Sequence, residues 1–473
     1  MNKTSLGHGT IYLTISTVVF VASGYLINII LGRYLGPASY GIYGVIITLM
    51  TTINLTQTSG LPIAVAKFIA EDEDKADAIL KTGLIIQIVS TAVVSVFVFI
   101  FAYSIASLFR DLTLVPYIQL SSIVFPLYGI YAIYTNYYNG LHFFQKQSLL
   151  NIVYAISKLV TVITLIYFFH VYGAILAFII SPIIALLFGL HFPKTVQTFP
   201  YKKLFLFSLP LIGSAIFGTL LQSIDLFSIK AILHSNKLTG FYTANQNIAE
   251  IPFFGITALA SVLFPGISRS IRHESPDKTR RLIQNSLRFC LLIITPSVFL
   301  ISSTSIQALA FLYSSIYNPG ASSLSILAFG AGFFTVFTLL STIMSASGYP
   351  IRAAALAGTG VLISLVSCIL LIPSFGMQGA ALATTIATGV ILVISGVMVY
   401  RKFYVLFNLK SAGKILLASF LIYFLARIIP IPTLLLPLLY LFLFGIYVTL
   451  LFFLKEITDE DIRLVKSLMR FRK

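Results

Sequence analysis

The chain has 473 residues, of which 58% are hydrophobic and only 10% are charged, and its formal net charge is +17. No soluble core of this length needs so large an apolar fraction, so the composition excludes an ordinary soluble domain and predicts a polytopic membrane protein. Both cysteines of the chain lie inside apolar segments, and we expect no disulfide framework, no metal site and no cofactor.

A transmembrane helix needs roughly 20 apolar residues, and runs of about this length recur along the whole chain. We therefore predict an all-α fold with fourteen transmembrane helices. They lie at residues 9–32, 41–63, 82–108, 116–139, 148–169, 173–192, 207–232, 240–266, 284–312, 322–347, 353–373, 377–400, 412–429 and 433–454.

The first twelve predicted helices form a six-helix unit that occurs twice. Tyr40–Tyr43 reappears as Thr239–Tyr242 at an offset of 199, and Tyr172–Ala177 matches Gln378–Ala383 at an offset of 206. Two halves that enter the membrane from the same side are related by an axis along the membrane normal. This layout is typical of an alternating-access carrier with its substrate site between the lobes.

The repeat divides the chain into two pseudo-symmetric six-helix lobes, which we place at residues 1–192 and 207–400. An interfacial cytoplasmic linker at 193–206 joins them. Two further transmembrane helices at 401–454 and a cytoplasmic amphipathic tail at 455–473 complete the chain.

Basic residues concentrate on one side of the predicted membrane. The termini and the loops after even-numbered helices, with their flanks, hold 25 of the 31 Lys and Arg residues. This bias follows the positive-inside rule, so we expect a multi-pass protein of the cell membrane with both termini in the cytoplasm. The net charge then indicates contact with anionic lipid headgroups and not nucleic-acid binding.

Two acidic residues, Asp225 and Glu250, lie inside predicted helices. Placing a carboxylate there costs about 2.5–3.5 kcal/mol, so it needs a partner or a function. Gln222 shares a helix face with Asp225, and Gln246 shares one with Glu250. These side chains either line an aqueous cavity with a protonatable or sodium-binding site, or form a satisfied interhelical network in which Asp225 pairs with Lys230.

Lys158 is the one base deep inside a predicted helix, near the midplane of the fifth. It either faces a cavity, where it would contact phosphate oxygens, or it snorkels or pairs with a carboxylate. Arg33 and Lys230 lie at the outer ends of the first and seventh helices, which are equivalent in the repeat.

Two prolines, Pro62 and Pro265, occupy matching places at an offset of 203, and each is followed by a base, Lys67 or Arg269. A proline in a transmembrane helix frees a backbone carbonyl and can mark a bend. The two bases then lie at the cytoplasmic mouth of a cleft, where they attract an anionic headgroup. Alternatively, they are ordinary bases at cytoplasmic helix ends.

The motifs also carry a family resemblance. Leu35–Tyr43, Leu209–Leu211, Asp225 with Gly240–Tyr242, and Leu263–Ser268 together resemble the polysaccharide-transporter family in order and spacing. That family includes O-antigen flippases and the stage V sporulation protein B group, within the multidrug/oligosaccharidyl-lipid/polysaccharide exporter superfamily.

The resemblance implies a V-shaped two-lobe carrier whose first, second, seventh and eighth helices line a central cavity. It implies a flippase that moves a polyprenyl-(pyro)phosphate-linked oligosaccharide from the inner to the outer leaflet, with membrane lipids and a coupling ion, sodium or proton, as partners. The chain departs from the lipid II branch, which has several cavity arginines, so we expect a polysaccharide unit as substrate. The cavity candidates are Lys158, Arg33, Gln222, Asp225, Lys230, Gln246 and Glu250, with Lys67 and Arg269 at the mouth.

Two alternatives remain open. A multidrug and toxin-extrusion carrier of the same superfamily would expel cations in exchange for sodium or protons, from a cavity with net acidic character. A membrane-embedded sugar polymerase or ligase would need catalytic groups on an outer loop, and the predicted outer loops are short and apolar. We expect a transporter, not an enzyme, acting as a monomer.

Overall fold

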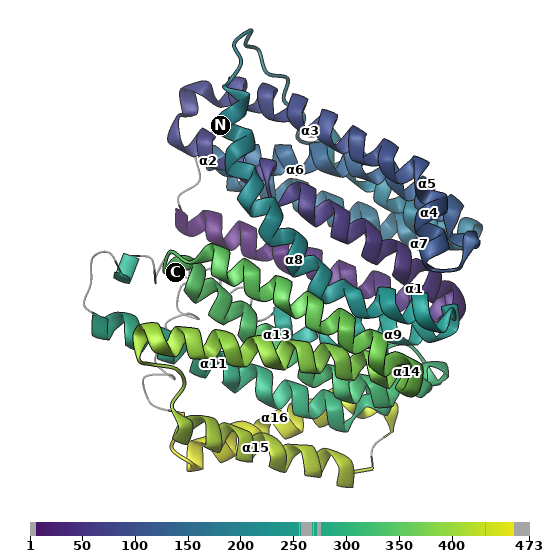
Figure 1. Cartoon of the computed structure of the whole chain (residues 1–473), viewed down its shortest axis with the longest axis vertical. Coiled ribbons are helices and arrows are strands. Elements are labelled where there is room, and N and C mark those ends of the chain that lie inside the picture. The colour runs from purple at the N-terminus through teal and green to yellow at the C-terminus, as the bar shows by residue number, and fades with distance from the viewer. Residues whose placement is uncertain are drawn as a thin grey trace. The chain divides into compact units, whose positions relative to one another are not determined.

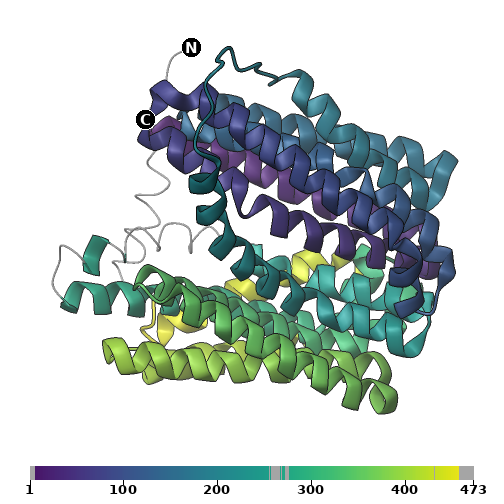
Figure 2. The same ribbon diagram turned by 45° about the horizontal axis from the view of Figure 1, so that its top comes forward.

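The computed structural model describes residues 6–254, 256, 267, 269–271, 276–430 and 432–457. Within this part of the chain the regular secondary structure is helical and contains no strand. The chain divides into two compact units, residues 1–243 (unit 1) and 244–473 (unit 2). The long helices of each unit run side by side as a bundle (Figures 1 and 2).

The helices of unit 1 are α1 (Leu6–Thr58), α2 (Leu61–Glu71), α3 (Ala76–Ile100), α4 (Ala102–Leu108), α5 (Val115–Ser122), α6 (Val124–Gly140), α7 (Phe144–Leu187) and α8 (Tyr201–Leu233). Helix α9 (Asn236–Ala249) includes the boundary between the units. Unit 2 continues with α11 (Pro276–Ser303), α12 (Ser305–Leu312), α13 (Ala321–Ala346), α14 (Pro350–Phe403), α15 (Leu409–Ile428) and α16 (Leu436–Phe453). Short 3₁₀ turns lie at Glu73–Lys75, Leu112–Leu114, Ser315–Gly320 and Thr433–Leu435.

The all-α polytopic membrane fold predicted from the sequence is confirmed. Ten helical segments of the described chain are long and apolar enough to cross a membrane. Three of them, α1, α7 and α14, contain a break at Gly36, His170 and Gly376, so each corresponds to two predicted helices. Thirteen predicted helices thus coincide with described ones. The remaining predicted helix, 240–266, begins in α9 and continues into residues outside the described part. The predicted tail also lies outside the described part after residue 457.

The repeat at an offset of 206 extends to the backbone. His170 in α7 has φ 46° and ψ −125°, and its equivalent Gly376 in α14 has φ 55° and ψ −132°. Three residues later, a Cβ built on Gly173 would lie 2.2 Å from the carbonyl oxygen of Leu165. A Cβ built on Gly379 would lie 2.3 Å from the equivalent oxygen. Both hairpins therefore use the same tight turn, which only glycine fits at the third position after the break.

The other repeated motif brings two helices into backbone contact. A Cβ on Gly41, in the second half of α1, would lie 1.9 Å from the carbonyl oxygen of Asn236. A Cβ on Gly240, in α9, would lie 1.8 Å from the carbonyl oxygen of Pro37. The two glycines that the sequence repeat aligns are thus neighbours in space, and both are needed for this close crossing.

A tyrosine-rich core joins α2, α3, α6 and α7 in unit 1. The hydroxyl of Tyr138 donates to the carbonyl of Gly189 at 2.7 Å, and that of Tyr134 to the carbonyl of His191 at 2.9 Å. The segment that follows is held against the start of α3, where Asp77 accepts from the backbone N–H of Lys194 at 3.0 Å. Residues 190–200 therefore form a non-helical segment that packs on unit 1 before α8 begins. The interfacial position predicted for 193–206 stays a prediction.

In unit 2, the last two helices pack beside α11 (Figure 1). Glu456, just after α16 and only 6% exposed, accepts a hydrogen bond from Arg288 of α11 at 2.9 Å. Its other carboxylate oxygen lies 3.5 Å from the ammonium of Lys414 in α15. This ion cluster fixes the end of α16 to both helices.

Candidate functional site

Lys158 lies in the first half of α7 and is only 7% exposed. Three ring centroids surround its ammonium nitrogen: Phe20 of α1 at 5.1 Å, Tyr154 one turn earlier at 5.1 Å, and Phe178 in the second half of α7 at 5.0 Å. These distances are those of cation–π contacts. Among the described residues, no carboxylate lies within ion-pair distance of Lys158. We call Phe20, Tyr154 and Phe178 the aromatic cage.

The aromatic cage continues into a cluster of phenol rings. Tyr154 stacks on Tyr131 of α6 at a centroid distance of 4.9 Å and lies 5.7 Å from Tyr128. The hydroxyl of Tyr131 donates to the side-chain oxygen of Asn151 at 2.7 Å. A band of phenols therefore leads from Lys158 toward the N-terminal end of α7.

Asp225 of α8 is buried, with 2% exposure. Its carboxylate accepts a hydrogen bond from the hydroxyl of Tyr242 in α9 at 2.7 Å and another from the backbone N–H of Leu226 at 2.8 Å. The sequence offered a pairing of Asp225 with Lys230 as one alternative. In the structure Lys230 pairs with a different carboxylate. Asp225 thus links α8 to the repeated Gly-x-Tyr motif.

Lys230 instead belongs to a cluster at the far end of α8. Its ammonium, 1% exposed, lies 2.5 Å from the carboxylate of Asp111 and also donates to the side-chain oxygen of Asn236. The amide of Asn236 donates to the same carboxylate at 3.1 Å. Burial alone would raise the pKa of Asp111, but the hydrogen bonds from Lys230, Thr113 and Asn236 outweigh it and lower that pKa to about 2. We call Asp111, Lys230 and Asn236 the outer clasp.

The remaining candidates are more accessible. Arg33 of α1 and Gln222 of α8 are exposed in unit 1. Lys67 of α2 is also exposed, pairs with Glu71 at 3.1 Å and lies over the ring of Phe207 at 4.5 Å. In unit 2, Gln246 and Glu250 are half-buried, and Arg269 is exposed. Pro265, the predicted partner of Pro62, lies outside the described residues.

Three of the candidates in unit 1 thus have described partners of different kinds: Lys158 in the aromatic cage, Asp225 with Tyr242, and Lys230 in the outer clasp. Sequence reasoning missed the partners Tyr242, Asn236 and Asp111. The signal for Tyr242 was its place in the repeated motif; Asp111 and Lys230 are separated by 119 residues, and no local pattern joins them.

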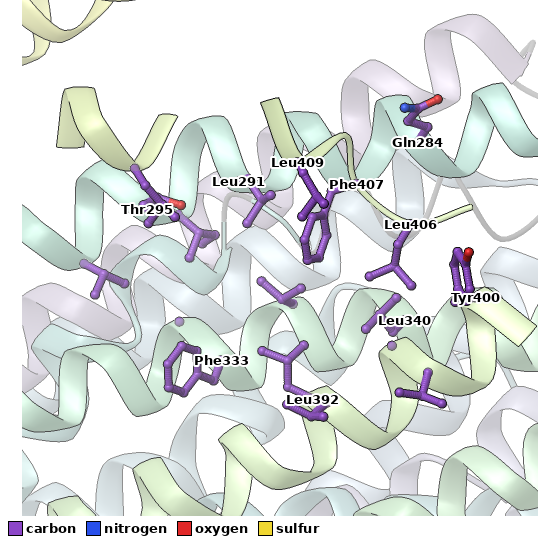
Figure 3. A pocket seen from close by; sticks show the side chains of 18 of the residues that line it. Gln284, Leu291, Thr295, Phe333, Leu340, Leu392, Tyr400, Leu406, Phe407 and Leu409 are labelled. Carbon is purple, nitrogen blue, oxygen red and sulfur yellow. The ribbon is translucent and has the colours of Figure 1, made fainter. Parts of the chain in front are cut away.

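A feature that sequence reasoning missed completely is a cavity of about 970 Å³ inside unit 2 (Figure 3). Helices α11, α13, α14 and α15 line it, together with the segment between α14 and α15. Its walls are mainly aliphatic and aromatic, with Gln284 and Tyr400 toward one end. No motif marks it because its lining residues are ordinary apolar ones from distant parts of the chain. Walls of this kind suit an apolar chain.

Residues 6–271 match the family described as "Polysaccharide biosynthesis protein". The chain is 24% identical over 444 residues to stage V sporulation protein B of Bacillus subtilis (strain 168), with 83% of each protein covered. It is 26% identical over 189 residues to the probable low-salt glycan biosynthesis flippase Agl15 of Haloferax volcanii, with 40% of each covered.

Solved structures that share the fold include the following two. The lipid II flippase MurJ, in an inward closed conformation, has a TM-score of 0.75 at 16% identity and covers 94% of this chain and 99% of its own. An inward-facing multidrug resistance transporter of the MATE family has a TM-score of 0.71 at 16% identity and covers 84% and 98%. The family match spans more than half of the chain, so the protein belongs to the polysaccharide biosynthesis protein family.

Proposed function

We propose that this protein is a flippase that moves a polyprenyl-(pyro)phosphate-linked oligosaccharide from the inner to the outer leaflet by alternating access between two lobes. The observation that carries the proposal is the family match over residues 6–271 in a chain whose helices are built to cross a membrane. The family has a role in polysaccharide biosynthesis, and the chain has many helices that can cross a membrane. Such a protein is suited to moving a biosynthetic intermediate across the bilayer.

Two further observations support the same function. One relative is named as a probable glycan biosynthesis flippase, and the fold is shared with a lipid II flippase. The internal repeat, with its matched turns at His170 and Gly376, fits a carrier built from two equivalent halves.

The distribution of basic residues supports a location in the cell membrane with both termini in the cytoplasm. In this orientation Lys67 and Arg269 lie near the cytoplasmic surface, where an exposed base attracts an anionic headgroup. Arg33 and Gln222 are exposed side chains that a sugar diphosphate can also reach. Membrane lipids surround the carrier, which acts as a monomer.

The proposed contact between Lys158 and the pyrophosphate requires an opening of the aromatic cage, since the ammonium has only 7% exposure. Phe20 is the ring best placed to move, because it is itself 36% exposed. Asp225 and Glu250 are the acidic residues at which the sequence alone suggested a coupling ion.

The proposal is tested in cells depleted of the protein. We expect the lipid-linked oligosaccharide to accumulate on the inner leaflet. There it cannot be reached by an enzyme that is added outside, cannot cross the membrane, and modifies galactose or N-acetylglucosamine. Unchanged labelling of the outer leaflet would contradict the proposal. Sodium- or proton-driven efflux of ethidium, with outer-leaflet labelling unchanged, would instead favour the multidrug carrier whose fold the chain shares.

A further inference from the structure

The aromatic cage holds a basic group without an anionic partner. Phe20, Tyr154 and Phe178 surround the ammonium of Lys158 at 5.0–5.1 Å. The titratable groups that face this region are phenols: Tyr154 itself, Tyr128 and Tyr131 of α6, and Tyr43 of α1, which neighbours Tyr154. Phenols ionise near pH ~10, so none of them supplies a negative charge at neutral pH.

The acidic side chains of unit 1 that could balance Lys158 bind other partners. Asp111 is taken by Lys230, Asp225 by Tyr242, and Asp77 by His191 at 2.8 Å. Before α3, Glu71 pairs with Lys67 and Asp72 pairs with Lys75. In the described part of the chain, the side-chain contacts of the Lys158 ammonium are therefore with ring faces.

The second half of the repeat has no base at the equivalent place. At the offset of 206 that relates the turns at His170 and Gly376, Lys158 corresponds to Ser364 of α14. Ser364 is fully buried, with 0% exposure. The same fold thus accommodates a small neutral side chain at this position, so helix packing does not require a lysine. A charge present in one half only indicates a function specific to that half.

Burial and the ring contacts act on the charged form of Lys158 in opposite directions. An ammonium inside a transmembrane helix loses its hydration, which favours the neutral amine. Cation–π contacts with the three rings stabilise the ammonium and oppose this effect. A displacement of one ring weakens that stabilisation and favours release of the proton.

One of the three rings belongs to a different helix. Phe20 lies on the face of α1 that also carries Ser16 and Ser23, both buried and both hydrogen-bonded to their own helix. Tyr154 and Phe178 are fixed on the two halves of α7. The ammonium therefore attracts α1 to α7 when it is protonated, and this attraction is lost with the proton.

We propose that Lys158 in its aromatic cage is the proton-carrying site of the transport cycle, and that its protonation holds the first half of α1 against α7. The amine takes a proton from hydronium on one side of the membrane, forming an N–H bond, and returns it to water on the other. This inference rests on the proposed flippase function, and it assigns the coupling ion as a proton.

Site protonation is measured without any substrate. The chain contains no tryptophan, so Phe178→Trp places a single fluorescent indole against Lys158. We expect tryptophan emission of the purified protein to show a one-proton transition below pH ~10, where the phenols ionise. The transition should disappear when Lys158→Met is added.

The matched control is Lys146→Met, because Lys146 lies on the same helix over the ring of Tyr138 at 4.7 Å but outside the cage. It should leave the transition unchanged. Phe20→Trp is the second reporter, on the other helix, in case the first variant does not fold. A transition that persists in Lys158→Met, or none in either reporter, would overturn the inference.

Coupling is measured in proteoliposomes with a fluorescent polyprenyl pyrophosphate N-acetylglucosamine. We expect an imposed pH gradient to change the initial rate of transfer for the unmodified protein and for Lys146→Met, and Lys158→Met to abolish this response. A transfer rate that does not change with the gradient in the unmodified protein and both variants would refute the coupling while leaving the flippase function in place. No transfer in any of them, with the tryptophan transition present, would refute the flippase function instead, and the proton site would stand.

Discussion

The outer clasp makes a strong prediction about stability. Asp111→Asn leaves the ammonium of Lys230, which is 1% exposed, without its carboxylate partner, and Asn236 then offers it only an amide oxygen. Removing one partner of a buried ion pair costs about 3–5 kcal/mol because the other charge stays buried. Asp111 is 13% exposed and water can reach the site, so we expect a loss near the lower end, about 3 kcal/mol.

The pKa of Asp111 gives an independent magnitude. Lowering it from 3.8 to about 2 on folding corresponds to about 2.5 kcal/mol, at about 1.4 kcal/mol per pH unit. Because the folded-state pKa is below the unfolded one, this contribution is fully present above pH 3.8 and is lost as the pH falls through about 2. The unmodified protein should lose stability in this window, and Asp111→Asn should lose less.

The assay is reversible unfolding in mixed micelles of a mild detergent with an increasing fraction of dodecyl sulfate. The double variant Asp111→Asn with Lys230→Met removes both charges and should recover part of the loss. Two results would refute the reasoning: Asp111→Asn as stable as the unmodified protein, or a double variant no more stable than Asp111→Asn alone.

Three further predictions use the same unfolding assay. His170→Gly relieves a backbone conformation that favours glycine and should stabilise the protein by about 1 kcal/mol. Gly376→Ala at the equivalent turn should destabilise it by a similar amount, and two effects of the same sign would contradict the matched turns. Gly240→Ala places a Cβ 1.8 Å from a backbone oxygen and should cost about 3 kcal/mol or more, whereas Gly24→Ala in α1 has nothing within 4 Å and should cost nothing. Glu456→Gln leaves its two basic partners without a carboxylate and should cost about 3 kcal/mol; a loss below about 0.5 kcal/mol would show that the cluster is solvated.

Much of the architecture could be predicted from the sequence because its signals are local. Apolar runs of membrane length mark helices wherever they occur, and short polar interruptions mark turns, as at Gly36 and Gly376. The internal repeat carried further information, since it aligned Gly41 with Gly240, and these residues prove to be in contact. A repeated glycine indicates a close approach of backbones, although the sequence does not say to which helix.

The side-chain environments could not be predicted in the same way. The sequence placed Lys158 inside a helix, but the three rings around it come from α1 and from both halves of α7, and their convergence depends on tertiary packing. For Lys230 the nearest acid in sequence suggested Asp225, whereas the folded chain brings Asp111 across from another helix end. The apolar cavity of unit 2 left no trace in the sequence, because its residues are indistinguishable from lipid-facing ones.

The measurement that tests the central claim most directly is transfer of a fluorescent polyprenyl pyrophosphate sugar across liposomes that contain only the purified protein. A membrane-impermeant reductant added outside bleaches the fluorophores of the outer leaflet. With the probe initially confined to the inner leaflet, we predict that the protein makes a growing fraction available to the reductant, while protein-free liposomes keep it protected. Equal protection with and without the folded protein would contradict the account.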